Sequence, residues 1–144
     1  MGSHGDMSER EKMVTALKEI VVPALRKKGF KGSFPHFRRI TESHIDLLSF
    51  MFSQWDGRFC VDVGKCPLEG IIYYSGKTIP PNKAKATCAV NRFRLGHTPE
   101  MVDYWFVYDE TDSDKRFEEL AREVVHKLSQ AASFWSDNCP DAHS

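Results

Sequence analysis

The chain has 144 residues, and its lysines and arginines match its aspartates and glutamates at 20 each, so the formal net charge is zero. A neutral chain has no global field that attracts DNA, anionic lipid or acidic substrates, which argues against those classes of partner. This length suits a domain that buries a hydrophobic core without disulfides or metal ions.

The ends of the chain and its cysteines bear on boundaries and location. Residues 1–7, MGSHGDM, resemble the remnant of an expression tag. Residues 8–137 are expected to form a single α+β domain, and residues 138–144 are expected to fray. We see no secretory leader and no long apolar run, and the cysteines lack the paired spacing of a zinc site. These features predict a cytoplasmic protein with reduced thiols, no membrane contact, and no metal ion or other cofactor. The cysteines are Cys60, Cys66, Cys88 and Cys139.

A helix is expected to begin at residue 9, because Ser8 and Glu11 match the capping box, in which each side chain takes a free backbone N–H. Pro23 lacks an N–H and disfavours helical geometry at Val22, so it should bend this helix or split off its final turn. Apolar residues at three- and four-residue steps form a stripe for the core. They are Met13, Leu17, Ile20, Val21, Ala24 and Leu25.

The end of this helix is strongly cationic. Arg26, Lys27 and Lys28 complement the negative end of the helix dipole. Gly29 suits the left-handed position that follows a helix, and Phe30 can fold back on the last apolar residue, as in a Schellman motif. This structural explanation of the cations is favoured over phosphate binding.

The strongest hairpin signal is Asp56-Gly57, which separates two runs rich in β-formers at residues 47–55 and 58–64. A two-residue turn here pairs Phe52 with Val61 and assigns alternate side chains to opposite faces of the sheet. The expected core face carries Leu48, Phe50, Phe52, Phe59, Val61 and Val63. The other face carries Leu47, Ser49, Met51, Ser53, Cys60 and Asp62.

A second two-residue turn, at Glu42-Ser43, would place Phe37 opposite Leu48 on the core face. It would also place Arg39 across from Asp46 as an ion pair. The alternation of phenylalanine and basic residues from 34 to 39 therefore predicts a strand with two unlike faces. Its side chains on the face away from the core are Phe34, His36 and Arg38.

Residues 65–87 contain glycine, two adjacent prolines and no sustained period, so we expect a long excursion that is either a functional lid or disordered. The segment GIIYYSGKTI within it is not a phosphate loop, because the glycine spacing is wrong and no helix start follows. Residues 88–96 then resume as a strand. This strand is expected to turn Ala89, Phe93 and Leu95 inward, and Arg92 and Arg94 outward.

Residues 101–110 are apolar on both faces, which is typical of a central or partly covered strand. A final helix is expected from Asp114 to Trp135. Glu118 with Arg122, and Glu123 with Lys127, should form ion pairs on its wet side. Its apolar side carries Phe117, Leu120, Ala121, Val124, Leu128 and Ala131.

The order of these elements lacks the strand–helix alternation of parallel sheets. We therefore predict an α+β fold with an antiparallel sheet of about five strands. The N-terminal and C-terminal helices should both pack on one face of the sheet.

Four stretches resemble a known family: PALRKKGF (residues 23–30), FRR (37–39), FSQ (52–54) and RFCVDVG (58–64). Together they give a helix, a Gly-Phe pair, a strand and a hairpin. In this pattern, over about residues 13–108, the chain resembles the bacterial family known as domain of unknown function 4304. The resemblance implies an α+β fold and brings with it no activity, cofactor or catalytic residue.

The sheet face opposite the helices is the main candidate for function. It would be aromatic and charged, and the two arginines two positions apart on one strand could grip a carboxylate or phosphate bidentately. We therefore predict a non-enzymatic binding module that uses this face and the 65–87 excursion to hold a protein partner or a small anionic ligand. The residues assigned to it are Phe34, His36, Arg38, Met51, Asp62, Arg92 and Arg94.

Three alternatives stay open. The face could be a solvated surface with an Asp62–Arg ion pair, or a homodimer interface. Cys60 with His36 and Asp62 are the residue types of a small hydrolase or transferase, although we expect nothing nearby to lower the pKa of the thiol. Weak nucleic-acid binding, which the zero net charge disfavours, would use Lys27, Lys28, Lys31, Arg38 and Arg39.

Overall fold

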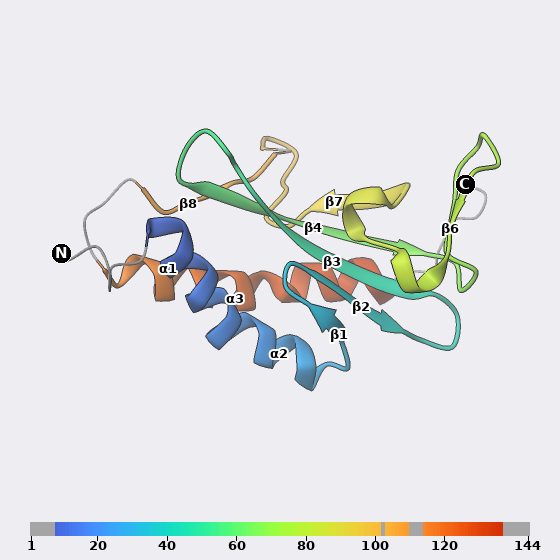
Figure 1. Cartoon of the computed structure of the whole chain (residues 1–144), viewed down its shortest axis with the longest axis horizontal. Helices are drawn as coiled ribbons and strands as arrows, with labels where there is room; N and C mark the ends of the chain where they lie inside the picture. Colours follow the sequence, from blue (N-terminus) through green and yellow to red (C-terminus); the bar gives the residue numbers. More distant parts are fainter. Residues whose placement is uncertain (1–7, 102, 110–113, 137–144) are drawn as a thin grey trace.

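The computed structural model describes residues 8–101, 103–109 and 114–136, in which the N-terminal and C-terminal helices pack on one face of an antiparallel sheet (Figure 1). This is the α+β fold that the sequence predicts. The expectations for residues 1–7 and 138–144 lie outside the described residues. The helices are α1 (Glu9–Ala16), η2 (Leu17–Val21), α2 (Val22–Lys27), η3 (Pro81–Lys83), η4 (Ala86–Cys88) and α3 (Arg116–Ser136). The strands are β1 (Lys31–Ser33), β2 (His36–Ile40), β3 (Ile45–Phe52), β4 (Arg58–Cys66), β5 (Ile71–Ile72), β6 (Thr78–Ile79), β7 (Asn91–Arg94) and β8 (Phe106–Val107).

The N-terminal helix begins with the predicted capping box. The backbone N–H of Glu11 donates to Ser8 Oγ at 3.1 Å, and the N–H of Ser8 donates to the Glu11 carboxylate at 2.9 Å. The helix is not split at Pro23, as one form of the prediction had it. Instead a π-helical turn, η2, precedes the proline, and the N–H of Val22 donates to the carbonyl of Leu17. The wider turn absorbs the missing donor, so α1, η2 and α2 run on from one another.

The end of α2 forms the predicted Schellman motif. The N–H of Phe30 donates to the Leu25 carbonyl and that of Gly29 to the Arg26 carbonyl, both at 3.0 Å. Gly29 has a φ of 96°, in the left-handed region. The Arg26 guanidinium donates to the carbonyls of Phe30 at 3.3 Å and Gly32 at 2.7 Å, so this cation has a structural role.

The strands are ordered β1-β2-β3-β4-β7, and β8 pairs with the beginning of β4 beyond the end of β7. Between β2 and β3 the register is the predicted one, with Phe37 opposite Leu48 and Arg39 opposite Asp46. The two-residue turn at 42–43 is closed by a 2.8 Å hydrogen bond from the Thr41 N–H to the His44 carbonyl.

The register between β3 and β4 differs from the predicted one by two residues. Phe52 lies opposite Phe59 rather than Val61, and the turn spans residues 53–57. Ser53 Oγ accepts the amides of residues 55 and 56 at 3.1 and 3.3 Å, and this side-chain cap stabilises a wider turn than Asp56-Gly57 alone. Because the side-chain period of a strand is two residues, the shift leaves every residue on its predicted face.

The main hydrophobic core lies between the sheet and the helices. The predicted core face of β3 and β4 faces it, and Leu48, Val61 and Val63 are fully buried. The predicted ion pairs on the wet side of α3 are present, with Glu118–Arg122 and Glu123–Lys127 each at 3.5 Å. The predicted stripe of α3 also packs on this core and comprises Phe117, Leu120, Ala121, Val124, Leu128 and Ala131.

Two expectations about individual residues are wrong. Phe34 lies in the turn between β1 and β2, where strand alternation does not apply, and its ring stacks on Phe50 on the helix side, with centroids 5.0 Å apart. Ala89 lies before β7 begins and packs on the face away from the helices. Of the two forms predicted for residues 101–110, the central strand is wrong, because β8 has two residues and pairs with β4 alone; with Phe106 buried, it is a partly covered strand.

The excursion at residues 65–87 is ordered and covers one end of the face opposite the helices. Its first two residues complete β4; β5 and β6 then form a hairpin, and η3 and η4 lead back towards β7. It buries a second, smaller core against the sheet, which explains why Ile45 and Leu47 are fully buried although they point away from the helices. This second core comprises Ile45, Leu47, Cys66, Ile71, Ala84, Ala86 and Ala89.

None of the helices in the described residues is long and apolar enough to cross a membrane.

Candidate functional site

Four polar side chains lie in one row across the face opposite the helices. The register pairs His36 of β2 with Ser49 of β3, Ser49 with Asp62 of β4, and Asp62 with Arg94 of β7. Ser49 is fully buried and Asp62 is 6% exposed. The excursion leaves part of this face uncovered. We use the term open face for this row and the uncovered side chains on either side of it.

His36 is anchored within this row. Its Nδ1 lies 2.8 Å from Ser49 Oγ. Burial lowers the pKa of His36 from its usual value, and the positive charge of nearby Lys85 lowers it further. The imidazole is therefore neutral at neutral pH. Because the Ser49 hydroxyl is fully buried, the pair does not present a nucleophile to a substrate.

The two arginines of β7, which were predicted to grip an anion together, contact different partners within the chain. Arg94 lies 3.4 Å from the Asp62 carboxylate and 3.5 Å from that of Asp103. Arg92 instead donates to the backbone carbonyl of Thr87. Each guanidinium already has a partner within the chain, so the Asp62–Arg94 ion pair, which the sequence raised as an alternative, is what the structure contains.

Three other cations are left without partners beside this row. Lys31 of β1 lies directly opposite Arg38 of β2, and both residues lie on the open face. Lys85 belongs to the excursion, where its neighbours Ala84 and Ala86 pack in the same small core as Leu47, the residue opposite Arg38, and its positive charge acts on His36. Across residues 8–101, 103–109 and 114–136, none of these three side chains makes an ion pair or a hydrogen bond. Like charges directly opposite each other destabilise a sheet, so the fold alone does not account for this cluster. We call Lys31, Arg38 and Lys85 the cationic cluster.

An apolar shelf lies on the other side of the row. Met51 of β3 is 41% exposed, and it is paired with Cys60 of β4. Trp105, just before β8, completes the shelf. Its ring contacts two guanidiniums, with Arg58 4.5 Å and Arg94 5.2 Å from the ring centroid. Cation–π contacts of this kind fix the ring in place.

Cys60 lacks the properties of a nucleophile. It is 1% exposed, and burial raises the pKa of its thiol to about 12, with the cation of Arg94 only partly opposing this. His36 is bonded to Ser49, and no hydrogen bond within the described residues joins it to Cys60. The three residues predicted as a catalytic set therefore share a face without forming a proton-transfer chain.

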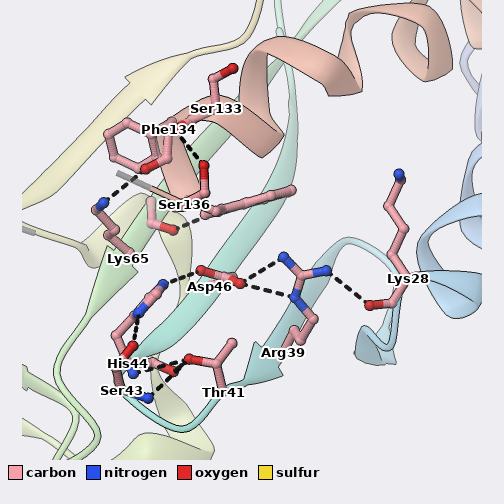
Figure 2. A network of polar contacts seen from close by, with 12 residues as sticks. Lys28, Arg39, Thr41, Ser43, His44, Asp46, Lys65, Ser133, Phe134 and Ser136 are labelled. Atoms are coloured by element: carbon pink, nitrogen blue, oxygen red, sulfur yellow. Dashed lines mark hydrogen bonds and ion pairs between the residues drawn. The ribbon is translucent and has the colours of Figure 1, made fainter. Parts of the chain in front are cut away.

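A different polar network, which the sequence did not single out as a site, surrounds Asp46 (Figure 2). This carboxylate is 1% exposed and accepts hydrogen bonds from Arg39 Nε at 2.9 Å and from His44 Nε2 at 2.6 Å. The second ring nitrogen of His44 lies 2.8 Å from Ser43 Oγ. The network borders a pocket of about 380 Å³ that also reaches Trp135 near the end of α3.

Ser43, His44 and Asp46 are the residue types of a hydrolase triad, but their surroundings do not support that chemistry. Arg39 neutralises the Asp46 carboxylate through a 2.8 Å ion pair. The amides of Ser43 and His44, which would be the nearest donors for an oxyanion, are bonded to Thr41 Oγ1 at 3.3 and 3.1 Å.

We therefore assign the Asp46 network to structure. The Arg39 guanidinium also donates to the Lys28 carbonyl at 2.9 Å and lies 4.7 Å from the Phe30 ring and 5.4 Å from that of Trp135. It joins the end of α2, strands β2 and β3, and the end of α3. Arg39 is thus committed to the fold and is not available to a nucleic acid.

No group of three or more histidine, cysteine or acidic residues suited to a metal ion occurs in the part of the chain that the structure describes. Sequence reasoning did not assign Ser49, Lys85 or Trp105 to the candidate site. The hairpin parity already placed Ser49 on the open face, but no local signal placed Lys85 or Trp105, because each reaches the face through a non-local return of the chain.

Comparison with known proteins gives one match. The family described as "Domain of unknown function (DUF4304)" matches residues 21–137. This includes α3, which lies beyond the stretch, ending near residue 108, in which the sequence resemblance is recognisable. No curated protein and no solved structure is significantly similar to the chain.

Proposed function

Because this chain belongs to the family described as domain of unknown function DUF4304, whose description assigns no activity, we propose a function from the geometry: a non-enzymatic binding module whose open face holds an anionic group of a partner. The cationic cluster is the observation that carries this proposal. Three cations that lack carboxylate partners within the described residues gather beside a histidine that is itself in an electropositive site. A carboxylate or phosphate placed among them would offset their mutual repulsion.

The arrangement of the other candidate residues agrees with binding rather than catalysis. Cys60 is buried with a raised pKa, and Ser49 is buried beneath its neighbours. Neither side chain is accessible to a substrate, so the hydrolase or transferase alternative lacks a nucleophile among these residues. Since Cys60 and Cys66 are free thiols in the interior, we also propose that the protein works in a reducing compartment, the cytoplasm.

A titration with hexaglutamate, followed by isothermal calorimetry at low salt, tests the proposal. We compare the wild-type protein with the variant Lys31→Gln/Lys85→Gln. Each exposed ion pair contributes about 0.2–1 kcal/mol, so losing two cations should weaken binding by about two- to thirty-fold. The matched control is Lys12→Gln/Lys77→Gln, which removes the same charge from two exposed lysines elsewhere. Equal weakening in the two variants would reduce the effect to net charge and would refute a specific site.

A further inference from the structure

We infer that the occupant of the open face is an extended acidic segment of a partner protein that also carries one large apolar side chain. This inference rests on the proposed function and specifies its ligand. The open face has two unlike halves, and only an occupant with both characters would match both. The cationic cluster lies on one side of the row from His36 to Arg94, and the shelf of Met51 and Trp105 lies on the other.

The apolar half of the open face is exposed, whereas the other end of β3 is covered by the excursion. Along β3, Ile45 and Leu47 are fully buried beneath the excursion, whereas Met51 on the same face is 41% exposed. The excursion therefore closes one end of this face and stops short of the other. Met51 lies opposite Cys60 of β4, and Trp105 precedes β8 on the other side of β4. An exposed methionine and a tryptophan on neighbouring strands are the kind of adaptable apolar surface that receives a partner side chain.

The two halves are separated by a distance that suits an extended peptide. Met51 lies four residues along β3 from Leu47, and Leu47 is the residue opposite Arg38. At about 3.3 Å per residue, the shelf and the cationic cluster are roughly 13 Å apart along the strand direction. A peptide in extended conformation spans this when its apolar side chain and its first acidic one are about four positions apart, with three residues between them.

A small anion or a nucleic acid would satisfy only part of this surface. Two pockets of the described residues lie elsewhere, one between the β2–β3 turn and α3 and one between α1 and α3. The two cations beside the shelf are already paired, Arg94 with Asp62 and Asp103, and Arg58 with Asp56. A chain of phosphates that continued from the cationic cluster across the shelf would therefore find neither guanidinium unpaired. A segment that is acidic at one end only does not need a cation there.

The test compares peptides of the same composition that differ only in spacing. Trp-Ser-Gly-Ser-Glu-Glu and its reverse, Glu-Glu-Ser-Gly-Ser-Trp, place the apolar and acidic side chains about four residues apart, and either chain direction would be detected. Ser-Gly-Ser-Trp-Glu-Glu places them side by side. We expect the better of the two spaced peptides to bind at least five-fold tighter than the adjacent one, as measured by fluorescence anisotropy.

Variants of the protein test whether the tighter binding of the spaced peptide depends on Met51. Met51→Ser should remove the advantage of the spaced peptide, and Met101→Ser, which alters another methionine that is 52% exposed, should keep it. Met51→Gln serves as a second variant of similar volume, and thermal melting verifies that each variant is folded. Lys31→Gln/Lys85→Gln should weaken all the peptides.

The outcomes separate this inference from the proposed function. Equal affinity for spaced and adjacent peptides, with binding still sensitive to Lys31→Gln/Lys85→Gln, overturns the inference and leaves the binding module in place. Absence of binding by every peptide and by hexaglutamate overturns both. Tighter binding of a single-stranded oligonucleotide than of any peptide overturns the choice of a protein partner. Dimerisation that buries Met51, seen by light scattering and lost in Met51→Ser, identifies a second copy as the occupant and overturns it as well.

Discussion

Replacing Asp46 by alanine should destabilise the protein more than any surface substitution, because this carboxylate is the centre of a buried network. It is 1% exposed and accepts from both Arg39 and His44. Removal of one partner from a buried ion pair costs about 3–5 kcal/mol, since the other charge is left uncompensated. Arg39 is 28% exposed and can turn partly towards water, so we expect the lower end of that range, about 3 kcal/mol.

The assay is urea unfolding followed by tryptophan fluorescence, with the slope of the transition unchanged and its midpoint lowered. At about 3 °C per kcal/mol for a chain of this size, the melting temperature should fall by about 9 °C. The double variant Arg39→Met/Asp46→Leu, which removes both charges, should be more stable than Asp46→Ala. The control is Asp103→Ala, since that carboxylate is paired with Arg94 but is 74% exposed and should contribute under about 1 kcal/mol. A loss below about 1 kcal/mol in Asp46→Ala would refute the structural assignment of the network.

Three further predictions concern the thiols, the histidine and the β3–β4 turn. Peptide-resolved alkylation should label Cys88, which is partly exposed, well before Cys60 or Cys66. Burial raises the pKa of the Cys60 thiol to about 12 and that of the Cys66 thiol to about 11. Faster labelling of Cys60 than of Cys88 would restore the catalytic alternative. Because the pKa of His36 is lowered in the folded protein, the unfolded state binds its proton more readily, and the unfolding free energy should fall as the pH drops below about 6.5. Urea titrations at pH 7.5 and 5.5 should show a smaller difference for His36→Gln than for wild type, and an equal difference would contradict this reading. In Gly57→Ala a Cβ would lie 2.5 Å from that of Asp109, whose carboxylate accepts the Gly57 N–H at 2.8 Å. This variant should therefore lose about 1–3 kcal/mol of stability in the same urea titration, and an unchanged midpoint would contradict the close contact.

Sequence patterns correctly predicted those structural features that depend only on residues close together in the chain. The capping box at Ser8, the Schellman motif at Gly29 and the stripe of α3 each depend on residues within one or two helical turns, and all three are present. The Glu42-Ser43 turn fixed the β2–β3 register for the same reason. The β3–β4 turn is wider because Ser53 and Asp109 hold it, and Asp109 comes from a distant part of the chain.

The open face was predicted in part, because hairpin parity decides which side chains lie on it. His36, Arg38, Met51 and Asp62 are all there. Parity does not predict which of the charged side chains form ion pairs or hydrogen bonds within the chain. Arg92 and Arg94 are engaged by Thr87 and Asp62, whereas Lys85 arrives from the excursion and joins Lys31 and Arg38. The proposed anion site therefore lies not at β7 but at the opposite edge of the same face, beside β1 and β2.

Chemical-shift mapping of the isotope-labelled protein with the better of the two spaced peptides tests the binding account most directly. The account predicts that the largest shifts fall on Lys31, Arg38 and Lys85 at one end of the bound peptide and on Met51 and the Trp105 indole at the other. Shifts centred instead on His44 and the end of α3, or confined to Arg92 and its neighbours, would contradict it.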